Sequence, residues 1–233
     1  MNYQEYLSKS FPYLAGLYRK YRLYQLSKKN TRQVFNDIYK NNTWKSQESV
    51  SGAGSTLEST SAVRGALPKI VRDFEIHTFL DLPCGDYHWM KEVELPVKKY
   101  IGADIVRALI EENNSKYSSE NVSFLPLNLL EDALPDSDVL LCRDCLVHLS
   151  FQDIVKGIRN IKQSKVRYLL TTTFPNVQSN ENIVTGRWRK LNLEIHPFNF
   201  SIPKVLVEEN GRTDSDRKCL ALWEVNDLNI PVV

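Results

Sequence analysis

The sequence predicts an α/β domain: a mostly parallel sheet of seven strands, with helices on both faces and a helical extension at the N-terminus. Two observations carry this prediction. Short apolar runs alternate with helical stretches between residues 77 and 172, a pattern typical of parallel sheets covered by helices. Two later apolar segments, 204–208 and 219–225, can then close the sheet as an antiparallel pair.

Length and composition fit one globular domain. The 233 residues are 42% hydrophobic and 25% charged, with 30 basic and 28 acidic side chains. No apolar run approaches the roughly 18 residues that span a bilayer, and the N-terminus lacks the apolar core of a secretory signal. Four irregularly spaced cysteines do not form a disulfide framework. We therefore expect a cytoplasmic protein without a membrane span, and exclude channels, secreted mini-proteins and fibres.

Residues 1–45 form a basic, tyrosine-rich segment, which we separate from a domain over 46–233. Its apolar and aromatic residues recur at three- and four-residue steps, which predicts a helix with one apolar face: Leu14, Leu17, Tyr18, Tyr21 and Tyr24. We favour a helix that packs this face on the domain. The alternative is an arm for an acidic partner, whether nucleic acid, anionic lipid or a phosphorylated substrate. The segment holds seven of the eleven tyrosines, Tyr3 and Tyr6 included. Its only acidic residues are Glu5 and Asp37, against nine basic ones: Lys9, Arg19, Lys20, Arg22, Lys28, Lys29, Arg32, Lys40 and Lys45.

The elements of the domain follow in order. Strands are expected over 77–82, 99–105, 121–125, 137–142 and 166–172, and the fourth is continuously apolar, as in a strand covered on both faces. Pro83 and Gly85 end the first strand in a turn. Helices are expected over 106–117, from about Leu57, and after Ser150, which can cap its helix with Asp153 as a capping-box variant.

Acidic residues stand where the first two strands end. Asp81 is followed by a turn in which Gly85 permits close backbone approach, and Asp104 ends the second strand 23 residues later. In open parallel sheets ligands bind beyond the carboxyl ends of the strands, and a strand-end acid can accept hydrogen bonds from a ribose diol. Both carboxylates are therefore expected in one nucleoside-shaped cleft.

Four segments carry a resemblance: FLDLPCGD (79–86), YIGADI (100–105), FLPLNLLEDALP (124–135) and DVLLCRDCLVHLSFQDI (138–154). Over roughly residues 42–225 the chain resembles class I S-adenosylmethionine-dependent methyltransferases, whose fold is Rossmann-like. WKSQESVSGAGS (44–55) and LLTTTFPN (169–176) resemble a bacterial subgroup associated with surface-polysaccharide genes. The resemblance implies S-adenosylmethionine as cofactor. It places Asp81, Cys84 and Gly85 near the methionine part, Asp104 on the ribose, Asn128 and Leu129 around the adenine, and Arg143 beside the cofactor.

The turn departs from the glycine-rich pattern of that family at Pro83 and Tyr87, and Pro83 supplies no backbone donor. The glycines of residues 51–55 can compensate, since a glycine-rich loop that leads into a helix is an anion site. We expect Gly54, Ser55 and Arg64 to hold the cofactor carboxylate, with Trp44 packed nearby. The alternative is a flexible hinge with an exposed arginine.

The acceptor side offers three candidates for a catalytic base. His148 lies four residues after Asp144, and its ordinary pKa suits a base near neutrality. Asp144 can orient this histidine or act itself, and His88 follows the cofactor turn. The alternative is that the histidine before this helix is structural.

The loop over 174–200 is long enough to be a functional segment or a lid. Arg187 and Arg189 flank Trp188, a pattern that can hold a phosphate or carboxylate, and His196 follows. These residues predict a small anionic or sugar substrate; the alternative is a lid with solvated arginines.

Together with these residues, the resemblance implies a methyltransferase acting on an oxygen, or less readily a nitrogen, of a small anionic or sugar-type substrate in capsule or polysaccharide biosynthesis. An RNA methyltransferase that uses the basic arm and a non-catalytic cofactor-binding subunit are the alternatives. Cys142 and Cys145 form a C-x-x-C pair, but no further ligands match a zinc site, so we expect no metal. The oligomeric state, a homodimer included, is left open.

Overall fold

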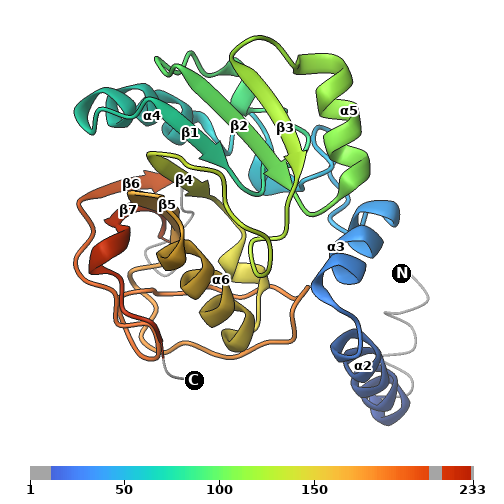
Figure 1. The fold of residues 1–233 in the computed structure, drawn as a ribbon. Coiled ribbons are helices and arrows are strands. Elements are labelled where there is room, and N and C mark those ends of the chain that lie inside the picture. The colour runs from blue at the N-terminus through green and yellow to red at the C-terminus, as the bar shows by residue number, and fades with distance from the viewer. Residues whose placement is uncertain (1–11, 210–216, 232–233) are drawn as a thin grey trace.

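The computed structural model describes residues 12–209 and 217–231. Tyr3, Tyr6, Lys9 and Glu5 lie outside the described residues. The helices are α2 (Pro12–Ser27), α3 (Thr31–Lys40), α4 (Ser61–Asp73), α5 (Arg107–Tyr117) and α6 (Phe151–Gln163), with short 3-10 turns η1 (Ala53–Ser55), η2 (Met90–Glu92), η3 (Leu146–His148) and η5 (Val225–Asp227). The strands are β1 (Thr78–Asp81), β2 (Lys99–Asp104), β3 (Val122–Pro126), β4 (Val139–Cys142), β5 (Tyr168–Thr173), β6 (Val205–Glu209) and β7 (Lys218–Glu224) (Figure 1).

The strands form one sheet in the order β3-β2-β1-β4-β5-β7-β6. β1 to β5 pair in parallel, whereas β7 lies antiparallel to both β5 and β6, so the expected closing pair is confirmed. The order reverses between β1 and β4, and such a switch point leaves a crevice at the carboxyl ends of the strands.

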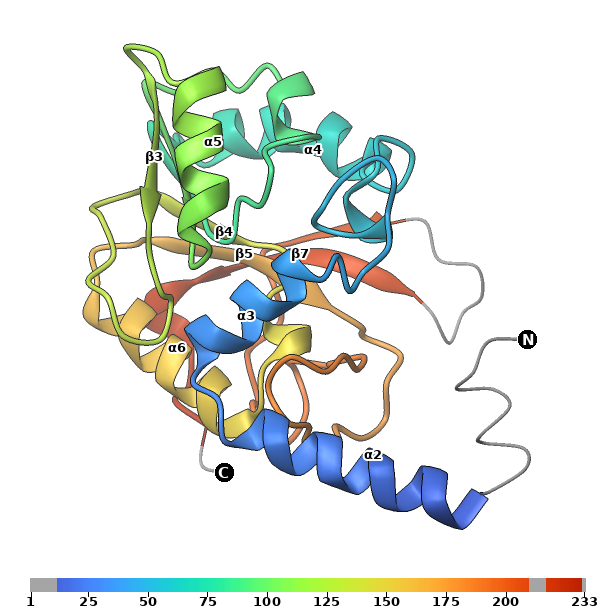
Figure 2. The same cartoon turned by 90° about the vertical axis from the view of Figure 1, so that its right-hand side faces the viewer.

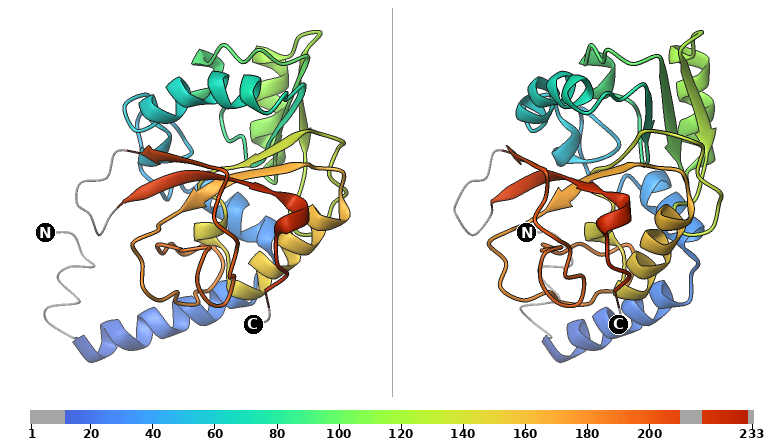
Figure 3. Two further views of the ribbon diagram at one scale, coloured as in Figure 1. Left: turned by 90° about the vertical axis from the view of Figure 1, so that its left-hand side faces the viewer. Right: turned by 60° about the vertical axis from the view of Figure 1, so that its left-hand side comes forward.

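Side chains along each strand alternate between two cores, as the period of two in a strand requires. Phe79, Leu141 and Leu170 face α4 and α5, while Leu80, Leu140 and Leu169 face α6 and the loop over 174–200. Figure 3 shows the sheet between these layers, with the loop beside α6. The predicted α/β fold with helices on both faces is therefore confirmed.

Helix α4 begins at Ser61, four residues after the expected start near Leu57. The hydroxyls of Thr56 and Ser59 donate to the Ala53 carbonyl, and that of Thr60 donates to the Thr56 carbonyl. Such local bonds offer the backbone an alternative to the helix, so the segment forms turns first.

Helix α6 begins as expected, because the Ser150 side chain accepts a hydrogen bond from the Asp153 amide. The reciprocal half of the capping box does not form. The Asp153 carboxylate accepts instead from the Thr185 hydroxyl at 2.6 Å, which anchors the 174–200 loop to the helix.

Helix α3 belongs to the packed domain, although residues 1–45 were expected to form a separate extension. Val34 and Ile38 are buried, and the Arg32 guanidinium donates to the Ile105 carbonyl at 3.0 Å. Gly186 of the 174–200 loop approaches α3 so closely that a Cβ there would lie 2.4 Å from Val34 Cγ1. In Figure 2, α3 crosses in front of the sheet.

The prediction that the apolar face of this helix packs on the domain was wrong. Leu14, Leu17, Tyr18, Tyr21 and Tyr24 are all exposed, because α2 runs along the edge of the molecule and turns its other side to the domain (Figure 2). No helix among the described residues combines the length and apolar character needed to cross a membrane.

Candidate active site

The main cleft lies at the switch point between β1 and β4. Measured out to its open mouth, open solvent included, it holds about 1100 Å³ of space. Asp81 at the end of β1 and Asp104 at the end of β2 both line it. The sequence prediction that these two carboxylates share one cleft is confirmed.

The turn after β1 depends on Gly85. Its φ of +55° is in the left-handed region, and a Cβ there would lie 2.0 Å from Ser51 Oγ, so only glycine fits. The Ser51 amide donates to Ser49 Oγ at 3.1 Å. Asp86 fixes this segment, because its carboxylate accepts from the Ser49 hydroxyl at 2.9 Å and the Val50 amide at 3.0 Å. The turn and the 49–55 loop therefore form one wall of the cleft.

Asp104 is fixed by backbone donors and keeps capacity for a ligand. Its Oδ1 accepts from the Val106 amide at 2.9 Å, and its Oδ2 accepts from the Gly85 amide at 3.2 Å. Burial raises the pKa of Asp104 to about 6, while these amide bonds oppose the rise. Each oxygen retains a lone pair, so the carboxylate can still accept from a pair of hydroxyls.

Asp81 is buried beside a tyrosine. The Tyr100 hydroxyl donates to Asp81 Oδ2 at 2.6 Å. Burial raises the pKa of Asp81 to about 7, and the Tyr100 bond only partly offsets this effect. A cationic group bound at this end of the cleft would favour the ionised form of Asp81.

The side of the cleft beyond Asp104 is apolar. Ile105, Val106 and Leu109 form a small buried cluster against which Phe35 and Tyr39 of α3 pack, and all five line the cleft. Leu127, Leu129 and Leu130 continue this wall after β3. A flat aromatic base can be buried between these side chains.

Asn128 lines the cleft, but its polar atoms are used locally. Its amide nitrogen donates to Glu131 at 3.0 Å, and its amide oxygen accepts from the Leu130 backbone at 3.1 Å. The side chain therefore shapes the loop after β3 that presents Leu129.

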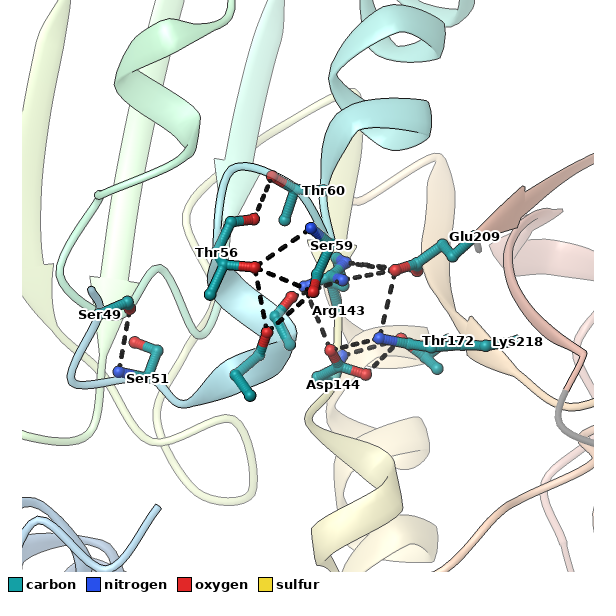
Figure 4. Close-up of polar contacts among 12 residues, drawn as sticks. Ser49, Ser51, Thr56, Ser59, Thr60, Arg143, Asp144, Thr172, Glu209 and Lys218 are labelled. Atoms are coloured by element: carbon teal, nitrogen blue, oxygen red, sulfur yellow. Dashed lines mark hydrogen bonds and ion pairs between the residues drawn. The ribbon is translucent and has the colours of Figure 1, made fainter. Parts of the chain in front are cut away.

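A buried charge network closes the other side of the cleft, at the ends of β4, β6 and β7 (Figure 4). The Arg143 guanidinium donates through Nε to both oxygens of Glu209, at 3.3 and 3.2 Å, and through a terminal nitrogen to the Gly54 carbonyl at 2.9 Å. Lys218 Nζ lies 3.2 Å from Glu209 and 2.6 Å from Asp144. Two cations and two carboxylates thus neutralise one another, and Arg143 ties the 49–55 loop to β4.

Asp144 projects from a left-handed backbone position, with φ of +51°. Its amide donates to Thr172 Oγ1 at 2.8 Å, and its carboxylate contacts Arg143 at 3.1 Å as well as Lys218. Although burial acts in the opposite direction, these cations lower the pKa of Asp144 to about 2. Asp144 is therefore ionised throughout the neutral range and is only a weak base there.

His148 also lines the cleft, and its ring lies 5.3 Å from the Trp44 ring, centroid to centroid. Its Nδ1 lies 3.0 Å from the Arg187 carbonyl oxygen. Because a carbonyl can only accept, Nδ1 carries the proton and Nε2 keeps its lone pair in the neutral ring. Burial lowers the pKa of His148, so the neutral ring predominates at pH 7.

The cofactor residues predicted in the 44–64 segment separate into two groups. Trp44 and Ser55 line the cleft, and Gly54 stands at its edge, where a Cβ would lie 3.1 Å from Asp144 Oδ2. Arg64 does not line the cleft. Its guanidinium donates to the Leu57 carbonyl at 3.0 Å, because the late start of α4 places it behind the loop.

Five other residues predicted to belong to the site do not line the cleft. His88 pairs with Glu48 at 2.9 Å, while Arg187, Trp188 and His196 are exposed on the 174–200 loop. Arg189 is buried, and its guanidinium donates to the Leu146 and Leu149 carbonyls at 2.9 and 2.8 Å. Arg187 and Arg189 therefore do not form a common anion site, because Arg189 holds the turn η3 in place.

The sequence reasoning missed Ser51, Phe35, Tyr39, Glu209 and Lys218. Ser51 lies in the glycine-rich loop over residues 51–55 that was assigned to the cofactor site, so it could have been predicted from that loop. Phe35 and Tyr39 were hidden by the assignment of residues 1–45 to an extension. Glu209 and Lys218 flank the connection between the two closing strands, and only the topology brings them beside Arg143.

Within the described ranges, 12–209 and 217–231, no group of three or more His, Cys, Asp or Glu side chains is placed to hold a metal ion. Cys142 is buried at the end of β4, and its pKa is raised by the hydrogen bond with Cys145 and by burial.

The sequence matches no protein-family model and no curated protein. Its fold resembles that of human N-acetylserotonin methyltransferase in complex with SAM, with a TM-score of 0.58 and 12% identity over 84% of this chain and 60% of that one. It also resembles the N-methyltransferase NodS from Bradyrhizobium japonicum WM9 in complex with S-adenosyl-L-homocysteine, with a TM-score of 0.58 and 12% identity over 84% of this chain and 98% of NodS.

A third structure, magnesium protoporphyrin IX methyltransferase from Synechocystis PCC 6803 with bound SAM, gives a TM-score of 0.54 and 11% identity over 83% of this chain and 96% of that one. The chain thus spans 60% of the length of the human protein and nearly all of the two bacterial ones. At these identities the likeness concerns the fold. The chain therefore has the Rossmann-like fold of S-adenosylmethionine-dependent methyltransferases.

Proposed function

We propose that this protein is an S-adenosylmethionine-dependent methyltransferase. The observation that carries the proposal is the cleft at the switch point, where Asp81 and Asp104 flank a space with one polar and one apolar side. Solved proteins of this fold hold S-adenosylmethionine or S-adenosylhomocysteine, which supports the same cofactor here.

The residues present fit this cofactor. Asp104 would accept hydrogen bonds from the ribose hydroxyls, and the apolar wall with Phe35, Val106 and Leu129 would cover the adenine. The carboxylate of Asp81 would face the cationic amino group. Ser55 and Trp44 would close the methionine end. When bound, the cofactor supplies an electrophilic methyl group on a sulfonium.

Proton removal from the acceptor falls to His148. An acceptor hydroxyl loses its proton to Nε2, while Nδ1 stays bonded to the Arg187 carbonyl and fixes the ring. That oxygen would then be free to accept the methyl group that a cofactor held by Asp104 and the apolar wall would supply, with S-adenosylhomocysteine as the leaving group. Asp144 stays ionised, so it contributes a negative charge near the resulting imidazolium and not a second base.

We propose an oxygen of a small anionic or sugar-type molecule as acceptor, within surface-polysaccharide biosynthesis. This assignment rests on the resemblance of residues 44–55 and 169–176. Because Arg189 is committed to the η3 carbonyls, recognition of an anion would fall to the exposed Arg187 and its neighbours.

Calorimetric titration with S-adenosylhomocysteine tests the cofactor assignment. We expect saturable binding that Asp104→Asn weakens at least tenfold, since a charged hydrogen bond is worth about 1.5–3 kcal/mol. Asp136→Asn is the matched control, because Asp136 is an exposed carboxylate paired only with Lys165 at the surface. The absence of binding heat from the folded wild-type protein would refute the proposal.

A screen of sugar, nucleotide-sugar and phosphorylated acceptors with methyl-labelled cofactor then tests the acceptor class. Transfer to a hydroxyl that His148→Gln abolishes, with cofactor binding unchanged, is the expected result. Transfer to amines alone would contradict the role of the base.

A further inference from the structure

Helix α2 carries the largest gathering of exposed apolar side chains among the described residues. Six of them are between 46% and 77% exposed, and we call them the α2 face: Tyr13, Leu14, Leu17, Tyr18, Tyr21 and Tyr24. At 3.6 residues per turn, these six positions fall within an arc of about 140°. Gln25, in the last turn of the helix, is polar and lies within the same arc. An exposed apolar face of this size marks an interaction site.

The α2 face points away from the domain. On the opposite side of the helix Ala15, Leu23 and Leu26 are half-buried, and Leu26 lies near Gly186 of the 174–200 loop. Figure 2 shows α2 along the edge of the molecule, beyond α3 and away from the sheet. The helix is therefore attached by one side and leaves the α2 face free for a partner.

The charged side chains of α2 are all basic. Lys20 and Arg22 stand at its two margins, Arg19 lies further back, and Lys28 follows the helix with its ammonium 5.0 Å from the Tyr24 ring centroid. No acidic residue occurs between residues 12 and 36. A negatively charged partner is therefore favoured, and a second copy of the helix would bring like charges together.

The apolar side chains of the α2 face favour an anionic lipid surface over a nucleic acid as partner. Tyr21 lies nearest the middle of the α2 face, with Leu17 and Leu14 on either side of it; these two aliphatic side chains gain from burial in lipid but offer no ring for stacking on a nucleobase. Tyrosines with a polar tip suit the interface between headgroups and acyl chains. An amphipathic helix with apolar residues on one face and basic residues at its margins lies flat in that layer.

We propose that α2 is an interfacial helix that holds the protein on a membrane surface rich in anionic lipid. The α2 face enters the headgroup layer, and Lys20 and Arg22 meet the lipid phosphates. Binding of this kind needs no spanning segment, and it is independent of the proposed catalytic function.

Co-sedimentation of the full chain with vesicles tests this proposal. We expect binding to vesicles of phosphatidylglycerol and phosphatidylcholine, much weaker binding to phosphatidylcholine alone, and loss of binding at high salt. Lys20→Glu with Arg22→Glu, and separately Leu17→Ser with Tyr21→Ser, should each weaken binding at least tenfold, since one basic residue near the surface contributes about fivefold.

Matched controls lie elsewhere on the surface. Ile202→Ser removes an apolar side chain that is 85% exposed, and Lys69→Glu with Lys165→Glu makes the same change in net charge on α4 and after α6. These controls should bind within twofold of the wild type, and thermal melting verifies that every variant is folded.

Three results would overturn the proposal. The first is wild-type protein that stays in the supernatant, or α2 variants that sediment like the wild type. The second is tighter binding of a short single-stranded RNA than of the vesicles, lost in the same variants. The third is a dimer in sedimentation velocity that dissociates when the α2 face is changed.

Discussion

Replacement of Glu209 by alanine is expected to destabilise the protein strongly. Glu209 is 2% exposed and is the partner of both Arg143 and Lys218. Its loss leaves the buried Arg143 guanidinium with Asp144 and the Gly54 carbonyl, while Lys218 keeps Asp144. Breaking a buried ion pair by removing one partner costs about 3–5 kcal/mol, which for a chain of this size lowers Tm by roughly 6–20 °C.

The neighbouring residue supplies the control. Glu208 pairs with Arg217 at 3.0 Å, but that pair is exposed, so Glu208→Ala should cost at most about 1 kcal/mol. Urea denaturation of the two single variants measures both free energies. The double variant Arg143→Met, Glu209→Leu should recover much of the lost stability, because it removes the uncompensated charge. Equal costs for Glu208→Ala and Glu209→Ala would refute the reasoning.

Three further predictions concern the cleft. Because the pKa of Asp81 is raised to about 7 in the folded state from an ordinary 3.8, the wild type should lose stability as pH rises from 4 to 7. In urea denaturation the free energy of unfolding of Asp81→Asn should match that of the wild type near pH 4 and exceed it by roughly 2–4 kcal/mol at pH 8. Parallel pH profiles of the two proteins would contradict this prediction. Gly85→Ala, which places a Cβ against Ser51 Oγ at a positive φ, should lower Tm, and Ser51→Gly should restore part of the loss; an unchanged Tm would show that the turn is not constrained. A chain that begins at residue 46 should lose affinity for S-adenosylhomocysteine in calorimetry, whereas one that begins at residue 30 keeps the α3 wall and should bind like the full chain; equal affinity in both would remove α3 from the site.

The sheet could be predicted from the sequence because a buried parallel strand has a distinctive apolar run, and the carboxyl end of such a strand is where ligands bind. The 77–82, 99–105 and 137–142 runs therefore located β1, β2 and β4, and with them Asp81, Asp104 and Arg143 at one cleft.

The errors concern contacts that spacing along the sequence does not reveal, some of them local and some between distant parts of the chain. Arg64 was placed by its distance from the glycine-rich loop, yet the Thr and Ser hydroxyls of residues 56–60 delay α4 and turn it away. Arg189 was predicted to form an anion site with Arg187, but its guanidinium donates to the carbonyls of Leu146 and Leu149. The helical spacing of α2 correctly predicted an apolar face and could not tell whether the domain or another partner would cover it.

The wall that α3 contributes to the cleft has a consequence for biosynthesis. Arg32 meets Ile105 from 73 positions away, and Val34 meets Gly186 from still further along the chain. During synthesis α3 leaves the ribosome early, but it can pack against Ile105 and Gly186 only after those residues have been made. The packing of α3 against Gly186 thus waits for the last third of the chain, whereas the residues that line the cleft all lie within the first 149.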